Sequence, residues 1–269
     1  MALTHLIIGA GNMGGSLLSG WLRDGLVSRR NVAILDPRPG TEAVYAIERG
    51  AKHIRSADDI PKSVKVVLLA IKPQMFADLR GTIGERLPKG ATLISIMAGI
   101  TLADLQACAP QCEVIRAMPN TPASIGRGIT GYVADEDVLP EIIADAEALL
   151  GACGEVVRVE TDALINAVTA ISGSGPAYVF HLCEALASAG KAVGLAPETA
   201  AKLARQTVIG ASALLAESER SPAALREAVT SPGGTTQAAL DVLMGDDGMT
   251  QLMRRAAKAA LERSRELSR

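Results

Sequence analysis

The sequence predicts an α/β chain, with an N-terminal domain on a parallel sheet, residues 1–160, and an all-helical domain, residues 161–269. Through the first half, short β-branched runs alternate with longer amphipathic stretches, as in β-α-β units. From about residue 161 the strand pattern stops, and Gly and Pro separate stretches of helical character. Only 2% of the 269 residues are aromatic, which suits closely packed helices better than an all-β fold.

The strands of the first half are predicted from their aliphatic and β-branched content. They cover residues 6–8, 32–35, 64–71, 93–97 and 114–118, with weaker signals at 131–133 and 156–159 that extend the sheet and close the domain. The predicted helices of the second half cover residues 161–171, 176–193, 197–217, 221–229, 234–244 and 248–267.

The second of these helices is unusually apolar. Between residues 177 and 189 only Tyr178, His181, Glu184 and Ser188 carry polar atoms, and they form one narrow stripe. A helix that is apolar around most of its circumference must be covered on several sides. A helical domain of about 110 residues is too small to cover two or three such helices by itself. We therefore expect a homodimer formed through the helical half.

Charge and cysteine content exclude several classes of partner. The net charge of −2 gives no basic field for nucleic acid or anionic lipid, so neither nucleic acid nor membrane is an expected partner. No set of His, Cys and carboxylate residues has the spacing of a metal site. The N-terminus turns apolar for only a few residues, unlike a signal peptide. We expect a cytoplasmic protein with reduced thiols at Cys108, Cys112, Cys153 and Cys183.

A glycine-rich motif follows the first strand and opens a helix, as the dinucleotide fingerprint of a Rossmann domain requires. Gly9 permits the tight turn, Gly11 lets the backbone approach a pyrophosphate, and Gly14 lets helix and strand pack closely. The helix start presents free N–H groups to phosphate. An ordinary glycine-rich turn is the alternative. The predicted cofactor-binding residues of this motif are Gly9, Ala10, Gly11, Asn12, Met13 and Gly14.

Two residues at the end of the second strand bear on the choice between NADH and NADPH. Asp36 lies 22 positions beyond Gly14, where a carboxylate accepts hydrogen bonds from the adenosine ribose hydroxyls and repels a 2′-phosphate. Arg38 lies two residues later and is suited to pair with that phosphate. Asp36 leads us to expect that NADH is used at least as well as NADPH, and Arg38 argues for NADPH.

Four further segments match one family as a set. They are Lys-Pro-Gln at 72–74, Arg-Ala-Met-Pro-Asn-Thr-Pro at 116–122, Ser-Gly-Ser-Gly-Pro-Ala-Tyr at 172–178 and Val-Thr-Ser-Pro-Gly-Gly-Thr-Thr at 229–236. In this order, and over essentially the whole chain, the sequence resembles pyrroline-5-carboxylate reductase. The resemblance implies a helical dimerisation domain that intertwines with a partner chain, in a dimer or in a ring of dimers. It also implies reduction of the cyclic imine 1-pyrroline-5-carboxylate to L-proline, the last step of proline biosynthesis, with NADPH or NADH.

The last of these segments is suited to bind the substrate carboxylate. A Pro-Gly turn precedes a helical stretch, so backbone N–H groups converge at a helix start, and the hydroxyl groups add donors. The resemblance implies that Thr236 contacts the ring nitrogen and that the loop serves the active site of the neighbouring subunit. A plain turn with an N-cap is the alternative. The predicted substrate-binding residues are Ser231, Gly233, Gly234, Thr235 and Thr236, with Thr236 as the catalytic residue.

Other cofactor contacts are expected at the carboxyl ends of buried strands, where ligands bind in open α/β sheets. Ala70, Lys72 and Pro73 follow one strand, and Asn120 follows another and is expected beside the nicotinamide ribose. A solvated strand-end lysine is an equal alternative for Lys72. His181 is a candidate general acid, although a histidine in an apolar helix more often has a structural role.

Two alternative functions fit parts of the sequence. A β-hydroxyacid dehydrogenase has a similar plan, with a catalytic lysine about four residues after a Gly-x-Gly that opens the helical half. Here Gly173-Ser174-Gly175 is followed by Pro176, Ala177, Tyr178 and Val179, so that lysine is missing. A dinucleotide-sensing module without turnover is the other alternative, and it has no need of a small anion pocket at residues 231–236.

Overall fold

The computed structural model of this chain describes residues 2–268, apart from the side chain of residue 79. It divides into two compact units. Unit 1 comprises residues 1–174 and 260–269, and unit 2 comprises residues 175–259. Unit 1 thus includes the helix that follows residue 161 and the last turns of the C-terminal helix. The predicted boundary at residue 160 concerns the functional domains rather than these compact units, and it remains a prediction.

Unit 1 is built on one eight-stranded sheet in the order β3-β2-β1-β4-β5-β6-β7-β8. The first six strands are parallel, and β7 runs antiparallel to β6. The strands are β1 (His5–Ile8), β2 (Val32–Leu35), β3 (Lys52–Ile54), β4 (Val66–Leu69), β5 (Thr92–Ser95), β6 (Glu113–Met118), β7 (Gly128–Ala134) and β8 (Gly154–Arg158). The chain order reverses between β1 and β4, which is where open α/β sheets bind ligands.

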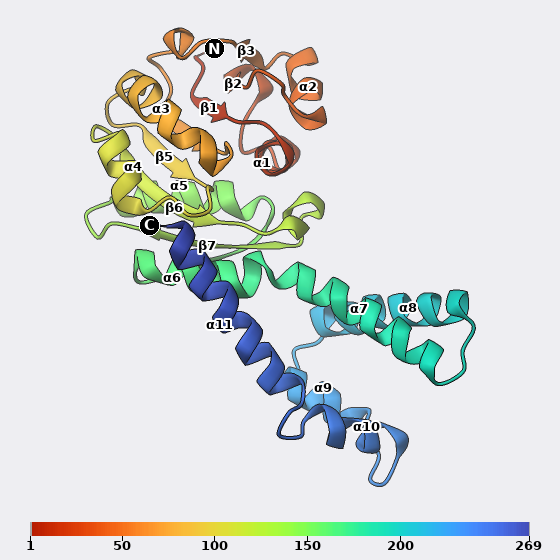
Figure 1. Cartoon of the computed structure of the whole chain (residues 1–269). Helices are drawn as coiled ribbons and strands as arrows, with labels where there is room; N and C mark the ends of the chain where they lie inside the picture. Colours follow the sequence, from red (N-terminus) through yellow and green to blue (C-terminus); the bar gives the residue numbers. More distant parts are fainter. Residues whose placement is uncertain (1, 269) are drawn as a thin grey trace. The chain divides into compact units, whose positions relative to one another are not determined.

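Helices cover both faces of this sheet (Figure 1). One buried cluster joins the sheet to α1 (Asn12–Arg23), α2 (Thr41–Glu48) and α5 (Pro140–Gly151), and it includes the fully buried Trp21 and Tyr132. A second cluster joins the other face to α3 (Phe76–Ile83) and α4 (Leu102–Cys108). The central strands are buried on both sides, which explains their continuous aliphatic sequences.

The helix after β8 is interrupted. α6 (Asp162–Val168) passes directly into a π-helical turn, η6 (Thr169–Gly173). The sequence predicted one helix over residues 161–171, and it gave no signal for the change of winding. Asn166 of α6 is buried, and its Oδ1 accepts hydrogen bonds from Ser264 at 2.8 Å and Ser268 at 3.2 Å. The last turns of the chain are thereby fastened to α6.

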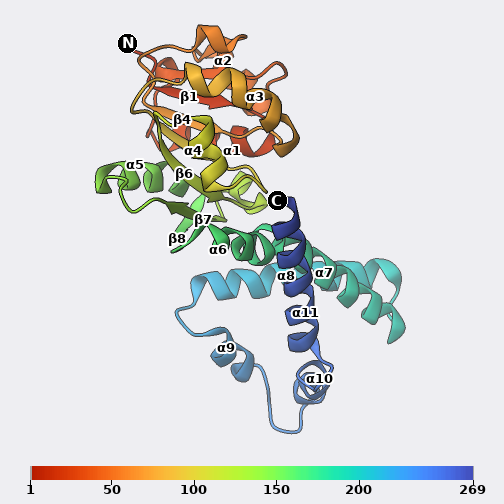
Figure 2. The same ribbon diagram turned by 60° about the vertical axis from the view of Figure 1, so that its left-hand side comes forward.

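Unit 2 consists of helices. α7 (Gly175–Ala192) and α8 (Pro197–Glu217) lie side by side in both ribbon views (Figure 2). α9 (Pro222–Ala228) and α10 (Thr235–Leu243) follow, and α11 (Met249–Leu267) begins in unit 2 and ends in unit 1. These bounds agree with the predicted helices to within two residues. The Gly and Pro positions between them account for that agreement, because both residues end or begin helices.

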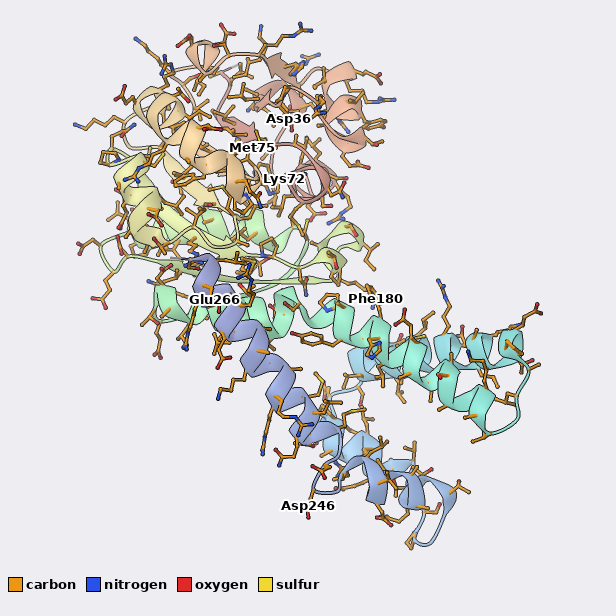
Figure 3. All side chains as sticks on the ribbon, in the orientation of Figure 1. Asp36, Lys72, Met75, Phe180, Asp246 and Glu266 are labelled. Atoms are coloured by element: carbon orange, nitrogen blue, oxygen red, sulfur yellow. The ribbon has the colours of Figure 1, made fainter. Side chains whose placement is uncertain are left out.

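Much of unit 2 is apolar and exposed. Only Ala200 and Ala204 are buried among residues 175–259, and Phe180 of α7 is 66% exposed (Figure 3). The helical run 162–192 is apolar and long enough to cross a membrane by length and composition, with 17% of its most apolar window buried within the chain. A helix that forms an interface with another chain has the same properties.

Candidate active site

A cavity of about 640 Å³ lies in unit 1, at the carboxyl ends of β1, β2, β3 and β4. Six predicted cofactor residues line it, namely Gly9, Gly11, Asp36, Arg38, Ala70 and Lys72. Figure 3 labels Asp36, which follows β2, and Lys72 and Met75, which both lie in the segment after β4. The remaining residues of the glycine motif support the loop rather than line the cavity; Ala10 and Gly14 among them are buried.

The geometry of the glycine loop fits a dinucleotide. Gly9 has φ +87°, and a Cβ there would lie 2.7 Å from the Ala70 carbonyl oxygen. A Cβ on Gly14 would lie 2.2 Å from the Gly9 carbonyl oxygen. Gly11 differs, since a Cβ there would meet no atom within 4 Å. Two glycines are therefore required by the fold of the loop, whereas Gly11 leaves the cavity side open at the start of α1, where N–H groups favour phosphate.

Asp36 organises this loop from the end of β2. One carboxylate oxygen accepts a hydrogen bond from the Ala10 N–H at 2.6 Å, and the other accepts one from the Arg38 N–H at 2.7 Å. These two hydrogen bonds fix the orientation of the carboxylate. Each carboxylate oxygen has a second lone pair, so the capacity to accept from ribose hydroxyls remains.

The cavity also contains positive groups that the sequence prediction missed. Arg55 and Ser56 follow β3 and line the cavity together with Arg38. Arg86 lies there too, but its Nε donates to the Asp58 carboxylate at 2.5 Å. The missing signal was β3 itself, because a strand of three residues has too little periodicity to be recognised.

Lys72 and Pro73 mark the end of the strand β4. Lys72 is exposed, and Pro73 is the first residue of a 3₁₀ turn, η3 (Pro73–Met75). Ala70 donates its N–H to the Ile8 carbonyl at 2.8 Å and packs against the glycine loop. β4 already ends at Leu69, and Pro73 begins the turn that leads into α3, so the expected contact of Pro73 with the cofactor remains a prediction.

Asn120 lies elsewhere on the same edge, after β6, and does not line this cavity. It is 9% exposed, and both ends of its amide bond protein groups. Its Oδ1 accepts from the Ile129 N–H at 3.0 Å, and its Nδ2 donates to the Ser172 carbonyl at 3.1 Å. Its expected contact with the nicotinamide ribose remains a prediction.

The predicted substrate turn lies in unit 2. Gly234 donates its N–H to the Ser231 carbonyl at 2.9 Å, Gly233 has φ +69°, and α10 begins at Thr235. Thr236 is half-buried, and Ser231 and Thr235 are exposed. The N-cap residue is Gly234, which has no side chain that could accept from the first N–H groups of this helix.

His181 and Glu184 lie one turn apart on α7, with 3.1 Å between the His181 Nδ1 and a Glu184 carboxylate oxygen. Their side chains are 80% and 77% exposed. Within unit 2 nothing encloses this pair. A role for His181 as a general acid remains a prediction.

Comparison with known proteins identifies the family. Residues 162–267 match the family model "Pyrroline-5-carboxylate reductase dimerisation", and residues 5–99 match "NADP oxidoreductase coenzyme F420-dependent". A pyrroline-5-carboxylate reductase of Pseudomonas aeruginosa is 39% identical over 97% of this chain and 95% of the relative. The chain belongs to the pyrroline-5-carboxylate reductase family.

Further members agree in length and in fold. The Synechocystis pyrroline-5-carboxylate reductase is 38% identical over the full length of both chains. The structure of a pyrroline-5-carboxylate reductase from Coxiella burnetii superposes with a TM-score of 0.87 at 33% identity, covering 99% of this chain and 98% of that one. The family resemblance read from the four sequence segments is thus confirmed, together with the α/β fold and the helical dimerisation domain.

Proposed function

We propose that this chain reduces 1-pyrroline-5-carboxylate to L-proline with NAD(P)H, the last step of proline biosynthesis. The full-length identity of 34–39% to curated pyrroline-5-carboxylate reductases carries the proposal. The reaction needs one site for the dinucleotide and one for the substrate carboxylate. The glycine loop at residues 9–14 supports the first, and the turn at residues 231–236, before α10, supports the second.

The dinucleotide would be held by unit 1. The start of α1 and the open side of Gly11 accept the pyrophosphate, and Asp36 lies at the end of β2 to receive the adenosine ribose. Ala70, Lys72 and Pro73 border the route toward the nicotinamide. When bound, the reduced nicotinamide supplies a hydride to the imine carbon.

The substrate carboxylate would be held by the turn 231–236, through the free N–H groups at the start of α10 and the hydroxyls of Ser231 and Thr235. The hydroxyl of Thr236 then faces the ring nitrogen and holds it as the planar imine becomes a secondary amine. We propose that this turn acts in the active site of the partner subunit of a dimer. A cytoplasmic location and a ring of dimers remain predictions.

For the cofactor, we propose that NADPH is the preferred reductant. In the sequence, Asp36 indicated that NADH is used at least as well as NADPH, whereas Arg38 and the family resemblance favoured NADPH. Both oxygens of that carboxylate accept backbone N–H groups, and two guanidinium groups, of Arg38 and Arg55, line the same cavity together with Ser56. Arginine is well suited to bind a 2′-phosphate.

This preference is tested by steady-state kinetics with both cofactors. Arg38→Ala and Arg55→Ala should each lower kcat/KM for NADPH by about 10-fold, the equivalent of about 1.4 kcal/mol, and leave kcat/KM for NADH nearly unchanged. An equal loss with NADH and NADPH, or a wild-type preference for NADH, would contradict the proposal.

The reaction itself is tested by incubating the dimeric protein with NADPH and 1-pyrroline-5-carboxylate and by measuring NADPH oxidation and proline formation. Proline should appear in equal amount to the NADPH consumed. A dinucleotide-sensing module would bind NADPH without turnover. A β-hydroxyacid dehydrogenase would instead reduce NADP⁺ in the presence of a β-hydroxyacid, and either result would exclude the proposed reaction.

A further inference from the structure

Asn120 joins three segments of unit 1 through its side-chain amide. It is the last residue before η5 (Thr121–Ile125), at the end of β6. Its Oδ1 accepts from the Ile129 N–H of β7, and its Nδ2 donates to the Ser172 carbonyl of η6. A side-chain amide that is nearly buried, and whose oxygen and nitrogen both bond to protein groups, typically has a structural role.

The segment that receives the Nδ2 bond is not a regular helix. Thr169–Gly173 is wound as a π-helix, and the Ser174 N–H donates to the Thr169 carbonyl at 2.8 Å, five residues back. The Ser172 hydroxyl also turns back and donates to the Val168 carbonyl at 3.0 Å. Single π-helical turns are rare and occur frequently at functional sites.

The Ser172 carbonyl lacks the donor that a regular α-helix would give it. In an α-helix its partner would be the N–H four residues later, and residue 176 is proline, which has no N–H. The Asn120 amide supplies a donor at this carbonyl. The Met-Pro-Asn segment and the Ser-Gly-Ser-Gly-Pro segment, far apart in the sequence, are therefore linked by one hydrogen bond.

Steric fit holds α6 and η6 against the sheet as well. A Cβ on Gly131 of β7 would lie 2.6 Å from a methyl carbon of Val168, so the absence of a side chain there allows the helix to approach. Met118, Val133 and Ile165 form a buried cluster at the same contact. The π-helical turn is thus held at its beginning by packing against β7 and at its end by the hydrogen bond from Asn120.

We propose that Asn120 is a positioning residue that holds the π-helical turn, and that it is not a ligand of the dinucleotide. Unit 1 ends at Ser174, so the Asn120–Ser172 bond anchors the last turn through which the chain passes into the helices of unit 2. This inference rests on the proposed function, since a fixed exit from unit 1 matters for catalysis only if both units serve one reaction.

Asn120→Asp separates the two contacts of the amide. The aspartate still accepts from the Ile129 N–H but has no donor for the Ser172 carbonyl. In the full-length dimer we expect amide exchange at residues 169–174 to become about 10-fold faster. We expect kcat/KM for the imine to fall about 10-fold, and the Kd of NADPH by calorimetry to stay within about 2-fold.

Ser124→Ala is the matched control. Ser124 is exposed on the same η5 segment, its hydroxyl donates only to the local Thr121 carbonyl, and its loss should change none of the three measurements. If Asn120→Asp weakened NADPH binding more than about 10-fold and left amide exchange unchanged, Asn120 would be a cofactor ligand and the proposal wrong. No change in any measurement would also overturn it.

Two further outcomes are distinguishable. If Asn120→Asp does not fold, Asn120→Ala, which brings no second oxygen toward Ser172, is measured against the same criteria. A wild-type protein that fails to reduce the imine would contradict the proposed function. The exchange and calorimetry results would still decide whether Asn120 supports the turn.

Discussion

The two units differ in how much apolar surface they bury by themselves. Unit 1 has a buried cluster on each face of its sheet and encloses large side chains such as Trp21 and Tyr132 completely. Unit 2 buries only Ala200 and Ala204, and leaves Phe180 and Val193 66% and 81% exposed. The sheet unit is therefore stabilised by its own contacts, whereas the helical unit requires a second apolar surface.

The same difference holds for the candidate site. The residues proposed to hold the dinucleotide lie within unit 1, where the Asp36 carboxylate accepts from the Ala10 N–H and Ala70 packs against Gly9. The predicted substrate turn 231–236 leads into the start of α10, with Ser231 and Thr235 exposed and Thr236 half-buried. A dimer that covers the helical unit would provide the surface that both its core and its substrate turn need.

The largest effect is expected from Leu186→Asp. Leu186 is 41% exposed on α7, and a carboxylate buried at a dimer interface costs several kcal/mol. We expect the protein to dissociate or unfold, as measured by light scattering and circular dichroism. Leu139→Asp is the control in unit 1, because Leu139 is 55% exposed and caps α5, where aspartate is favoured. A stable wild-type monomer at micromolar concentration would contradict the conclusion that the helical unit requires a second apolar surface.

A large loss of stability is expected in unit 1 from Asp162→Asn. The fully buried Arg116 has its ion-pair partner in Asp162, 2.7 Å away, while its Nε and Nη2 have no partner among the described residues. Leaving this cation unpaired should cost about 3 kcal/mol, or about 6–12 °C in Tm.

The controls for this pair are Asp24→Asn and a double replacement. Asp24 belongs to an exposed pair with Arg23, and its change should not alter Tm measurably. Arg116→Met with Asp162→Leu should recover much of the lost stability, because it removes both charges together. Equal losses from Asp24→Asn and Asp162→Asn would show that burial does not set the strength of this pair.

A moderate effect on turnover is expected from Thr236→Val. Loss of one neutral hydrogen bond, with a partner left unsatisfied, should lower kcat by about 3- to 100-fold and leave NADPH affinity unchanged. Thr235→Val should cost less, because its exposed hydroxyl is only one of several groups proposed to hold the substrate carboxylate. Wild-type turnover in Thr236→Val, with activity abolished in Thr235→Val or His181→Ala, would show that the donor is misassigned.

The smallest effect is expected on the pH dependence of stability, through a histidine of unit 1. Burial lowers the pKa of His5 below 6.5, and the Asp145 carboxylate offsets this in part. The unfolded chain therefore binds a proton at higher pH than the folded one, so this contribution to stability is lost as pH falls from 6.5 to the lower pKa. His5→Gln should flatten the decrease in Tm between pH 7 and pH 5. Identical pH profiles would contradict this role of His5.

Much of this fold could be predicted from sequence because its signals are local. The glycine motif, the aliphatic strands and the Pro or Gly positions at 194, 197 and 222 each act on neighbouring residues. The three residues of β3 were too few to recognise, and with β3 the sequence prediction missed Arg55 and Ser56 in the cavity. The substrate turn was found only through its resemblance to a family, since a turn with a helix start has many uses.

Hydrogen bonds between residues that are far apart in the sequence could not be predicted from it. Asn120 and Ser172 are 52 residues apart, and nothing in the local pattern of either segment indicates that they meet. The π-helical turn has the composition of an ordinary helix. The buried pair of Arg116 and Asp162 joins residues 46 positions apart in the same way.

A mixed dimer tests the central claim, that unit 1 of one chain and the substrate turn of its partner form one active site. Gly11→Asp should block the dinucleotide without disturbing the fold, since a Cβ there meets no atom within 4 Å. Thr236→Glu should repel the substrate carboxylate at a helix start that tolerates an acid. Each variant alone should be inactive. Doubly tagged, purified heterodimers should regain about half of the wild-type activity, because one of their two sites is intact. Heterodimers with no activity would show that both parts of the site come from the same chain.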